Sequence, residues 1–163
     1  MVAAPAPPRT TVPINPPSPD YFIPDRFKGK TIIVTGCARG MGAGAARRAA
    51  REGTNVVGVD GIKDLGAKTI SDIVASGGKA TLDGVFSGDE IDYQKQKPLI
   101  FAPIHEATDD YWDKVFRTNS GGVFRSMRAE LRQMVTQGRG GTIVNVASIA
   151  GMTGLAGKGL APV

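Results

Sequence analysis

The chain has 163 residues, of which 41% are hydrophobic and 21% charged, and its formal net charge is +5 at pH 7. This length and balance predict one globular domain with a modest core. No apolar run approaches the roughly 20 residues that span a bilayer, and the N-terminus lacks a signal-peptide pattern, so we expect a cytoplasmic protein. Cys37 is the only cysteine, which excludes an internal disulfide and a multi-cysteine metal site. We predict no metal centre.

The basic character of the chain, with a pI near 9.6, raises the question of nucleic-acid binding. Phosphate binding requires clustered lysine and arginine. Arg47, Arg48 and Arg51 share a short helical stretch, but the remaining basic residues are spread along the chain among acids. The charge pattern therefore favours a solvated surface, and we expect no nucleic-acid partner.

The N-terminal segment is rich in proline. Eight of the eleven prolines fall within the first 24 residues. Proline fixes φ and removes backbone donors, and the segment has few apolar side chains with which to build a core. We expect residues 1–27 to form a disordered or polyproline-II-like arm and residues 28–163 to form the folded domain. The alternative is that the apolar residues 21–23 pack on another surface.

A strand, a glycine turn, a helix and a second strand are predicted between residues 31 and 60. The β-branched run at 31–35 is typical of a strand buried on both faces of a parallel sheet. After it, Gly40, Gly42 and Ala45 satisfy the pattern G-x-G-x-x-G/A at the start of an alanine-rich helix that Gly53 ends. The second strand ends in Asp60.

This arrangement predicts a dinucleotide site. Glycines let the backbone approach a pyrophosphate at the helix N-terminus, and the acid accepts hydrogen bonds from the ribose hydroxyls. The alternative is a glycine turn that only packs the helix tightly against its strand.

The middle of the chain is predicted less completely. Apolar spacing indicates a helix from about Ile62 to the glycines 77 and 78, followed by a strand within residues 79–86. The sequence fits residues 79–88 equally well as the third or as the fourth strand of the sheet. Pro98 and Pro103 limit the next segment to an edge strand or a loop.

A long helix is predicted within residues 108–138, with Thr108 as a suitable N-cap. Three- and four-residue spacing indicates one inward face on it, formed by Trp112, Val115, Phe116, Asn119, Val123, Met127, Leu131 and Met134. A further buried strand is expected at 142–148.

Together these motifs resemble the short-chain dehydrogenase/reductase family. The resemblance rests on "TGCARGMG", "VVGVD", "TDDYWDKVFRTNSGGVF" and "GTIVNVASIAG", in that order. It implies an α/β fold with a Rossmann-type, doubly wound parallel sheet and hydride transfer between a secondary alcohol and a ketone. The cofactor-binding residues it implies are Thr35, Gly36, Arg39, Gly40, Met41, Gly42 and Asp60. The cofactor is expected to be NAD, because a carboxylate at Asp60 repels a 2′-phosphate, although Arg39 is a residue that can accommodate NADP.

The resemblance also implies catalytic roles for Ser148, which orients the substrate oxygen, and Asn119, which positions a water. The family's Tyr-x-x-x-Lys pair is absent, since no tyrosine follows Ser148 and Lys158 belongs to no such motif. We therefore expect an incomplete fold, with one internal strand–helix unit and the C-terminal strands and helices missing. An oligomer is possible, but the helix that usually forms its interface is missing too.

Two hypotheses follow. The first is a short-chain oxidoreductase acting on an unidentified small molecule and catalytically impaired in this chain. The second is a non-catalytic NAD-binding remnant or a partner subunit of a full-length homologue.

Overall fold

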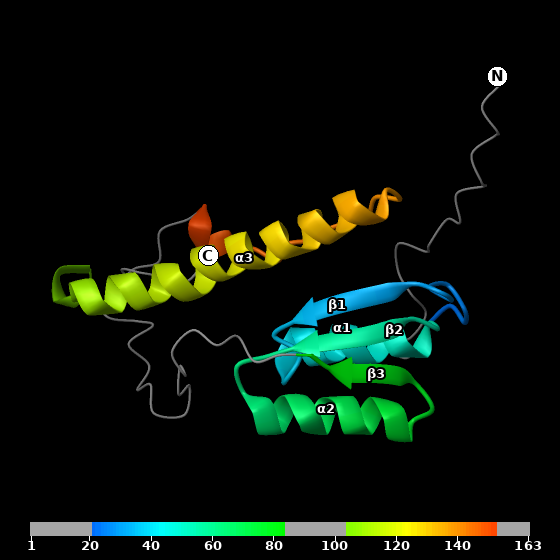
Figure 1. The fold of residues 1–163 in the computed structure, drawn as a ribbon. Coiled ribbons are helices and arrows are strands. Elements are labelled where there is room, and N and C mark those ends of the chain that lie inside the picture. Colours follow the sequence, from blue (N-terminus) through cyan, green and yellow to red (C-terminus); the bar gives the residue numbers. More distant parts are fainter. Residues whose placement is uncertain (1–20, 84–103, 153–163) are drawn as a thin grey trace. The chain divides into compact units, whose positions relative to one another are not determined.

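A computed structural model describes residues 21–83 and 104–152 (Figure 1). The chain divides into two compact units, one up to Tyr93 and one from Gln94. The predicted arm at 1–27 lies mostly outside the described residues, as does the segment 84–103.

The first unit alternates strands and helices. Its elements are β1 (Thr31–Thr35), α1 (Gly40–Arg51), β2 (Asn55–Val59), α2 (Lys63–Ala75) and β3 (Lys79–Leu82). The strands are parallel in the order β1-β2-β3, so their carboxyl ends lie at one edge of the sheet. Both helices end before a left-handed glycine, Gly53 with φ 90° and Gly77 with φ 85°, which confirms the two predicted stops.

The position of β3 decides between the two alternatives for residues 79–88. β3 pairs with β2, with Val56 opposite Ala80, and lies on the side of β2 away from β1. It therefore occupies the third-strand position, since a fourth strand in this topology pairs with β1. Residues 86–88 lie outside the described part of the chain.

The core of the first unit lies between the sheet and its two helices, which contact each other and cover one face (Figure 1). Its buried apolar residues are Ala46, Ala49, Val56, Ile70 and Ile73. The prediction that β1 is buried on both faces is wrong for the described structure, because Ile33 is 51% exposed. Both crossovers run in the same direction, so both helices lie on the same side and none of the described elements of this unit covers the other.

A buried carboxylate ties the chain before β1 to the end of α1. Glu52 is 1% exposed and accepts hydrogen bonds from Arg48 Nε, at 2.7 Å, and from the Ile23 backbone, at 3.3 Å. Arg26 adds an ion pair at 3.7 Å. A buried charge is tolerated when it is paired and hydrogen-bonded, as here.

The second unit consists of a short 3-10 helix (Ile104–Glu106), the long helix α3 (Asp109–Gln137) and a 3-10 turn (Ile149–Gly151). The predicted cap is confirmed, since Thr108 Oγ1 accepts a hydrogen bond from the Tyr111 amide at 3.2 Å. The predicted inward face is not buried in the described structure, where α3 has no buried residue. No other helix or strand of the described second unit is long enough to cover it.

The predicted strand at 142–148 is also wrong, since these residues have no regular structure and Val144 and Val146 are 80% and 78% exposed. A strand needs a neighbour to satisfy its backbone groups. The described residues of this unit contain no strand with which it pairs. No helix in the described ranges is long and apolar enough to cross a membrane.

Candidate functional site

The glycine turn leaves the sheet at the carboxyl end of β1. The Gly36 amide donates to the Val59 carbonyl at 2.8 Å, which continues the contact between β1 and β2 into the turn. Gly36 and Gly40 have φ of 73° and 58°, a region that side chains disfavour. A Cβ at either would meet no atom of the described residues within 4 Å, so no described side chain of this unit fills the space beside the backbone there.

Gly42 has a different reason to be glycine. A Cβ at this position would collide with the carbonyl oxygen of Gly36. Gly42 thus allows the first turn of α1 to approach the end of β1. Gly42 is therefore a packing glycine, as in the alternative that the sequence left open. Gly36 and Gly40 instead leave backbone accessible to a ligand.

The N-terminus of α1 is not capped by a side chain. Arg39 is the N-cap residue and makes no capping hydrogen bond, and the first turn contains no acidic residue. Met41, in that turn, is 81% exposed. Free amides and the positive end of the helix dipole make such a terminus suited to an anion.

Asp60 is attached to this turn by its side chain. Its Oδ2 accepts a hydrogen bond from the Ala38 amide at 2.7 Å, and its Oδ1 accepts one from the Ile62 amide at 2.8 Å. The carboxylate is therefore held in place at the edge of the sheet. Each oxygen retains a lone pair for a further donor.

Cys37 lies within the turn and is fully buried. Burial raises the pKa of its thiol, and the negative charge of Asp60 raises it further. Its Sγ would lie 2.7 Å from a Cβ added at Gly58, so the thiol fills space between turn and sheet. The side chain is a packing residue here.

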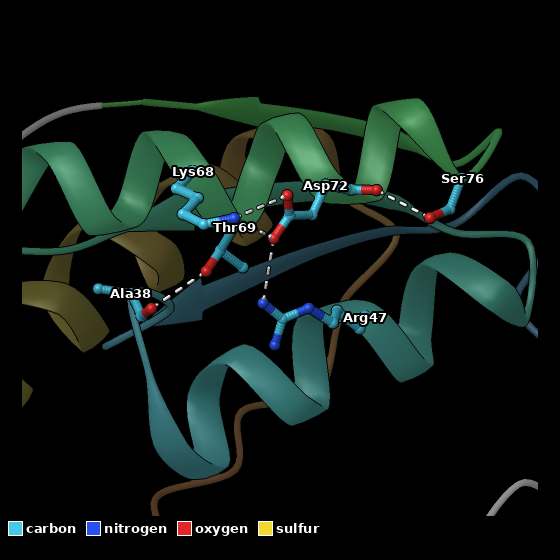
Figure 2. A network of polar contacts seen from close by, with 6 residues as sticks. All are labelled: Ala38, Arg47, Lys68, Thr69, Asp72 and Ser76. Atoms are coloured by element: carbon cyan, nitrogen blue, oxygen red, sulfur yellow. Dashed lines mark hydrogen bonds and ion pairs between the residues drawn. The ribbon is translucent and has the colours of Figure 1, made fainter.

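Sequence reasoning missed a contact between Ala38 and Thr69. Thr69, on α2, donates from its hydroxyl to the Ala38 carbonyl at 3.0 Å (Figure 2). A signal existed, because Thr69 is the single hydroxyl on the buried face formed by Gly66, Thr69, Ile70 and Ile73. Its partner, 31 residues earlier, has no side-chain signature.

The structure brings the predicted cofactor residues together in the first unit, around the turn and the end of β2. Thr35 ends β1, the next five belong to the turn and α1, and Asp60 joins them through Ala38. The two predicted catalytic residues lie in the second unit. Asn119 is half-buried in the middle of α3, and Ser148 is exposed immediately before the last 3-10 turn.

The family model described as short chain dehydrogenase matches residues 30–95 and 99–160. The chain belongs to the short-chain dehydrogenase family. It is 33% identical to a 3beta-hydroxysteroid dehydrogenase of Mediterraneibacter gnavus, over 82% of this chain and 54% of that protein. It is likewise 33% identical to a sorbitol dehydrogenase of Cereibacter sphaeroides, over 79% of this chain and 56% of that protein. The chain thus spans little more than half the length of these two relatives.

Solved structures of the family share the fold. A short chain dehydrogenase from Mycobacterium smegmatis matches with a TM-score of 0.66 and 26% identity, over 81% of this chain and 63% of that one. Carveol dehydrogenase from Mycobacterium avium, solved in complex with NAD, matches with a TM-score of 0.66, over 82% of this chain and 59% of that one. At 21% identity the second likeness concerns the fold alone. The parallel sheet is thus the Rossmann-type sheet of this family, and it has three strands in the described residues.

Metal ligands do not gather in the described ranges. No group of three histidine, cysteine, aspartate or glutamate side chains there could hold a metal ion.

Proposed function

We propose that the protein is an NAD-dependent oxidoreductase of the short-chain type, acting between a secondary alcohol and a ketone, and that its first unit holds the cofactor. The observation that carries the proposal is the turn between β1 and α1. There, open backbone at Gly36 and Gly40, an uncapped helix N-terminus and a fixed carboxylate at Asp60 lie together. The open backbone and the helix N-terminus suit a diphosphate, and the carboxylate suits the hydroxyls of a ribose.

Asp60 favours NAD over NADP. Two backbone amides hold its carboxylate, at 2.7 and 2.8 Å, so turning it away from a 2′-phosphate costs both hydrogen bonds. Arg39 is exposed in the same turn and is the residue that would favour NADP. We propose that the carboxylate dominates, because its position is fixed.

The side chains proposed to act on the substrate are those of Ser148 and Asn119. When bound, NAD supplies the carbon that accepts the hydride of the alcohol. Ser148 would hold the substrate oxygen with its hydroxyl, and Asn119 would hold a water for proton transfer. The substrate is proposed only as a small molecule with a secondary hydroxyl or a ketone, in the cytoplasm.

Residues 149–163 contain no tyrosine that could serve as the proton donor. General acid–base assistance contributes about 10² to 10⁴ in rate. We therefore propose that the 163-residue polypeptide binds NAD but has little turnover. This observation also supports the second candidate, a non-catalytic NAD-binding protein or a partner subunit of a full-length homologue.

A titration of the purified chain tests both parts of the proposal. We expect saturable NADH fluorescence, NADPH binding roughly tenfold weaker, and no turnover with a panel of secondary alcohols and ketones. In Asp60→Asn, which removes the charge but also replaces one of the two accepting oxygens by a donor NH2 group, the preference for NADH over NADPH should shrink. A chain that gives no NADH signal would contradict the binding proposal, and robust turnover would contradict the proposed impairment.

A further inference from the structure

Ala38 is held at both of its backbone groups by side chains from later parts of the chain. Its amide donates to Asp60 Oδ2 at 2.7 Å, and its carbonyl accepts from Thr69 Oγ1 at 3.0 Å. Ala38 and Thr69 are 6% and 2% exposed, so water does not compete for the second contact. The turn is thus fixed from the end of β2 and from α2 at the same residue.

The Thr69 contact determines the direction of a neighbouring donor. The carbonyl of Ala38 and the amide of Arg39 belong to one planar peptide group, and the described chain has no cis peptide bond. In a trans peptide the C=O and N–H point in opposite directions. Because Thr69 holds the carbonyl toward α2, the Arg39 N–H points away from α2.

A flip of this peptide would reverse its polarity. The Arg39 amide would turn toward α2, and the carbonyl oxygen of Ala38 would take its place. An acceptor would then stand where a donor stood, beside the uncapped start of α1 at which an anion binds best. The hydrogen bond from Thr69 opposes that flip.

We propose that Thr69 is a positioning residue for dinucleotide binding, which holds the Ala38–Arg39 peptide so that its N–H faces the diphosphate. The inference rests on the proposed function, because it assumes that the turn takes a diphosphate. Thr69 itself touches no ligand. It acts from α2 through the Ala38 carbonyl, as Figure 2 shows.

Ser76 offers a matched control on the same helix. Its hydroxyl also donates to a backbone carbonyl, that of Asp72, at 2.8 Å, but the contact is exposed and stays within the C-terminal turn of α2 (Figure 2). Removing it takes away a similar hydrogen bond without touching the glycine turn.

The test is NADH titration of the full chain and three variants, with folding verified by circular dichroism. Thr69→Val keeps the volume and removes the donor, and we expect its Kd for NADH to rise roughly 5- to 20-fold. Thr69→Ser keeps the hydroxyl and should stay within about threefold of the unmodified chain, as should Ser76→Ala. If Thr69→Val binds as tightly as Thr69→Ser, the proposal is overturned while the proposed function stands.

If the Thr69→Val variant does not fold, a second measurement on the unmodified chain tests the proposal. In the unmodified chain labelled with ¹⁵N, saturating NADH should shift the Arg39 amide resonance and slow its hydrogen exchange. An Arg39 amide unchanged by bound NADH would overturn the inference. A chain that does not bind NADH at all would instead overturn the proposed function, and this inference with it.

Discussion

Cys37 combines burial with a nearby negative charge. Its pKa is raised above the usual 9.0, first by burial and then by Asp60. As pH rises past that value, the unfolded chain releases the thiol proton while the folded chain keeps it. The folded state then holds more protons than the unfolded state, so stability falls with rising pH.

We therefore predict an alkaline loss of stability that depends on this thiol. In urea unfolding followed by circular dichroism, the unmodified chain should lose more unfolding free energy than Cys37→Ala as pH rises above 9.0. Lysines and tyrosines titrate in both proteins, so the comparison isolates the thiol. Cys37→Ala is expected to be less stable at pH 7, because it leaves a small cavity. Parallel pH curves for the two proteins would contradict the prediction.

The residues of the turn could be predicted because their signal is local. Gly36, Gly40 and Gly42 lie within seven positions, and Asp60 follows directly after the next strand. Which glycines leave open backbone and which one allows helix packing could be seen only in the structure. Gly36 and Gly40 are of the first kind and Gly42 is of the second. The Thr69–Ala38 contact could also be seen only there, because a backbone carbonyl leaves no trace in the sequence.

At the scale of elements, α2 and α3 differ in how their apolar residues are used. Ile73 of α2 is 3% exposed and belongs to the core, whereas Leu131 of α3 is 47% exposed. Leu131 is one of several exposed apolar side chains of α3, with Phe124 and Val135. Both helices are amphipathic in sequence, but only α2 has its apolar face covered by a sheet of the same unit.

This difference predicts unequal costs for similar substitutions. Ile73→Ala should lower the free energy of unfolding by about 2 to 5 kcal/mol, because it opens a cavity in the core. Leu131→Ala should change it by less than about 1 kcal/mol, since alanine also favours the helix. Urea unfolding of the two variants, with the unmodified chain alongside, measures both. A cost above about 2 kcal/mol for Leu131→Ala would mean that the α3 face is buried in the folded protein.

The elements between residues 31 and 82, and the start of α3, could be predicted because their boundaries carry their own signals. Gly53 and Gly77 end helices by adopting left-handed φ, and Thr108 starts α3 with a side-chain hydrogen bond. The strand predicted at 142–148 carries a comparable apolar pattern and does not form in the described structure. A helix satisfies its own backbone, whereas a strand depends on a neighbour that its own sequence does not encode.

At the scale of the whole molecule, the positive charge is paired in part with neighbouring acids in the described residues. In the described residues Lys28 pairs with Asp25 at 3.3 Å, Lys114 with Asp110 at 2.9 Å, and Arg47 and Lys68 with Asp72 at 3.6 and 3.2 Å (Figure 2). Exposed pairs of this kind add little stability. They do, however, place an acid beside each of these four basic side chains.

The chain should therefore bind duplex DNA poorly despite its net charge of +5 and pI near 9.6. Non-specific DNA binding depends on many simultaneous phosphate contacts, which release counterions and make affinity fall steeply with salt. We expect fluorescence anisotropy with a labelled 20-base-pair duplex to give a Kd weaker than about 10⁻⁴ M at 150 mM salt. NADH, which is held by one turn rather than by the whole surface, should lose only a few-fold in affinity when salt is raised from 50 to 500 mM. A micromolar Kd for DNA with a steep salt dependence would mean that the arginines of α1, or residues outside the described ranges, form a basic surface after all.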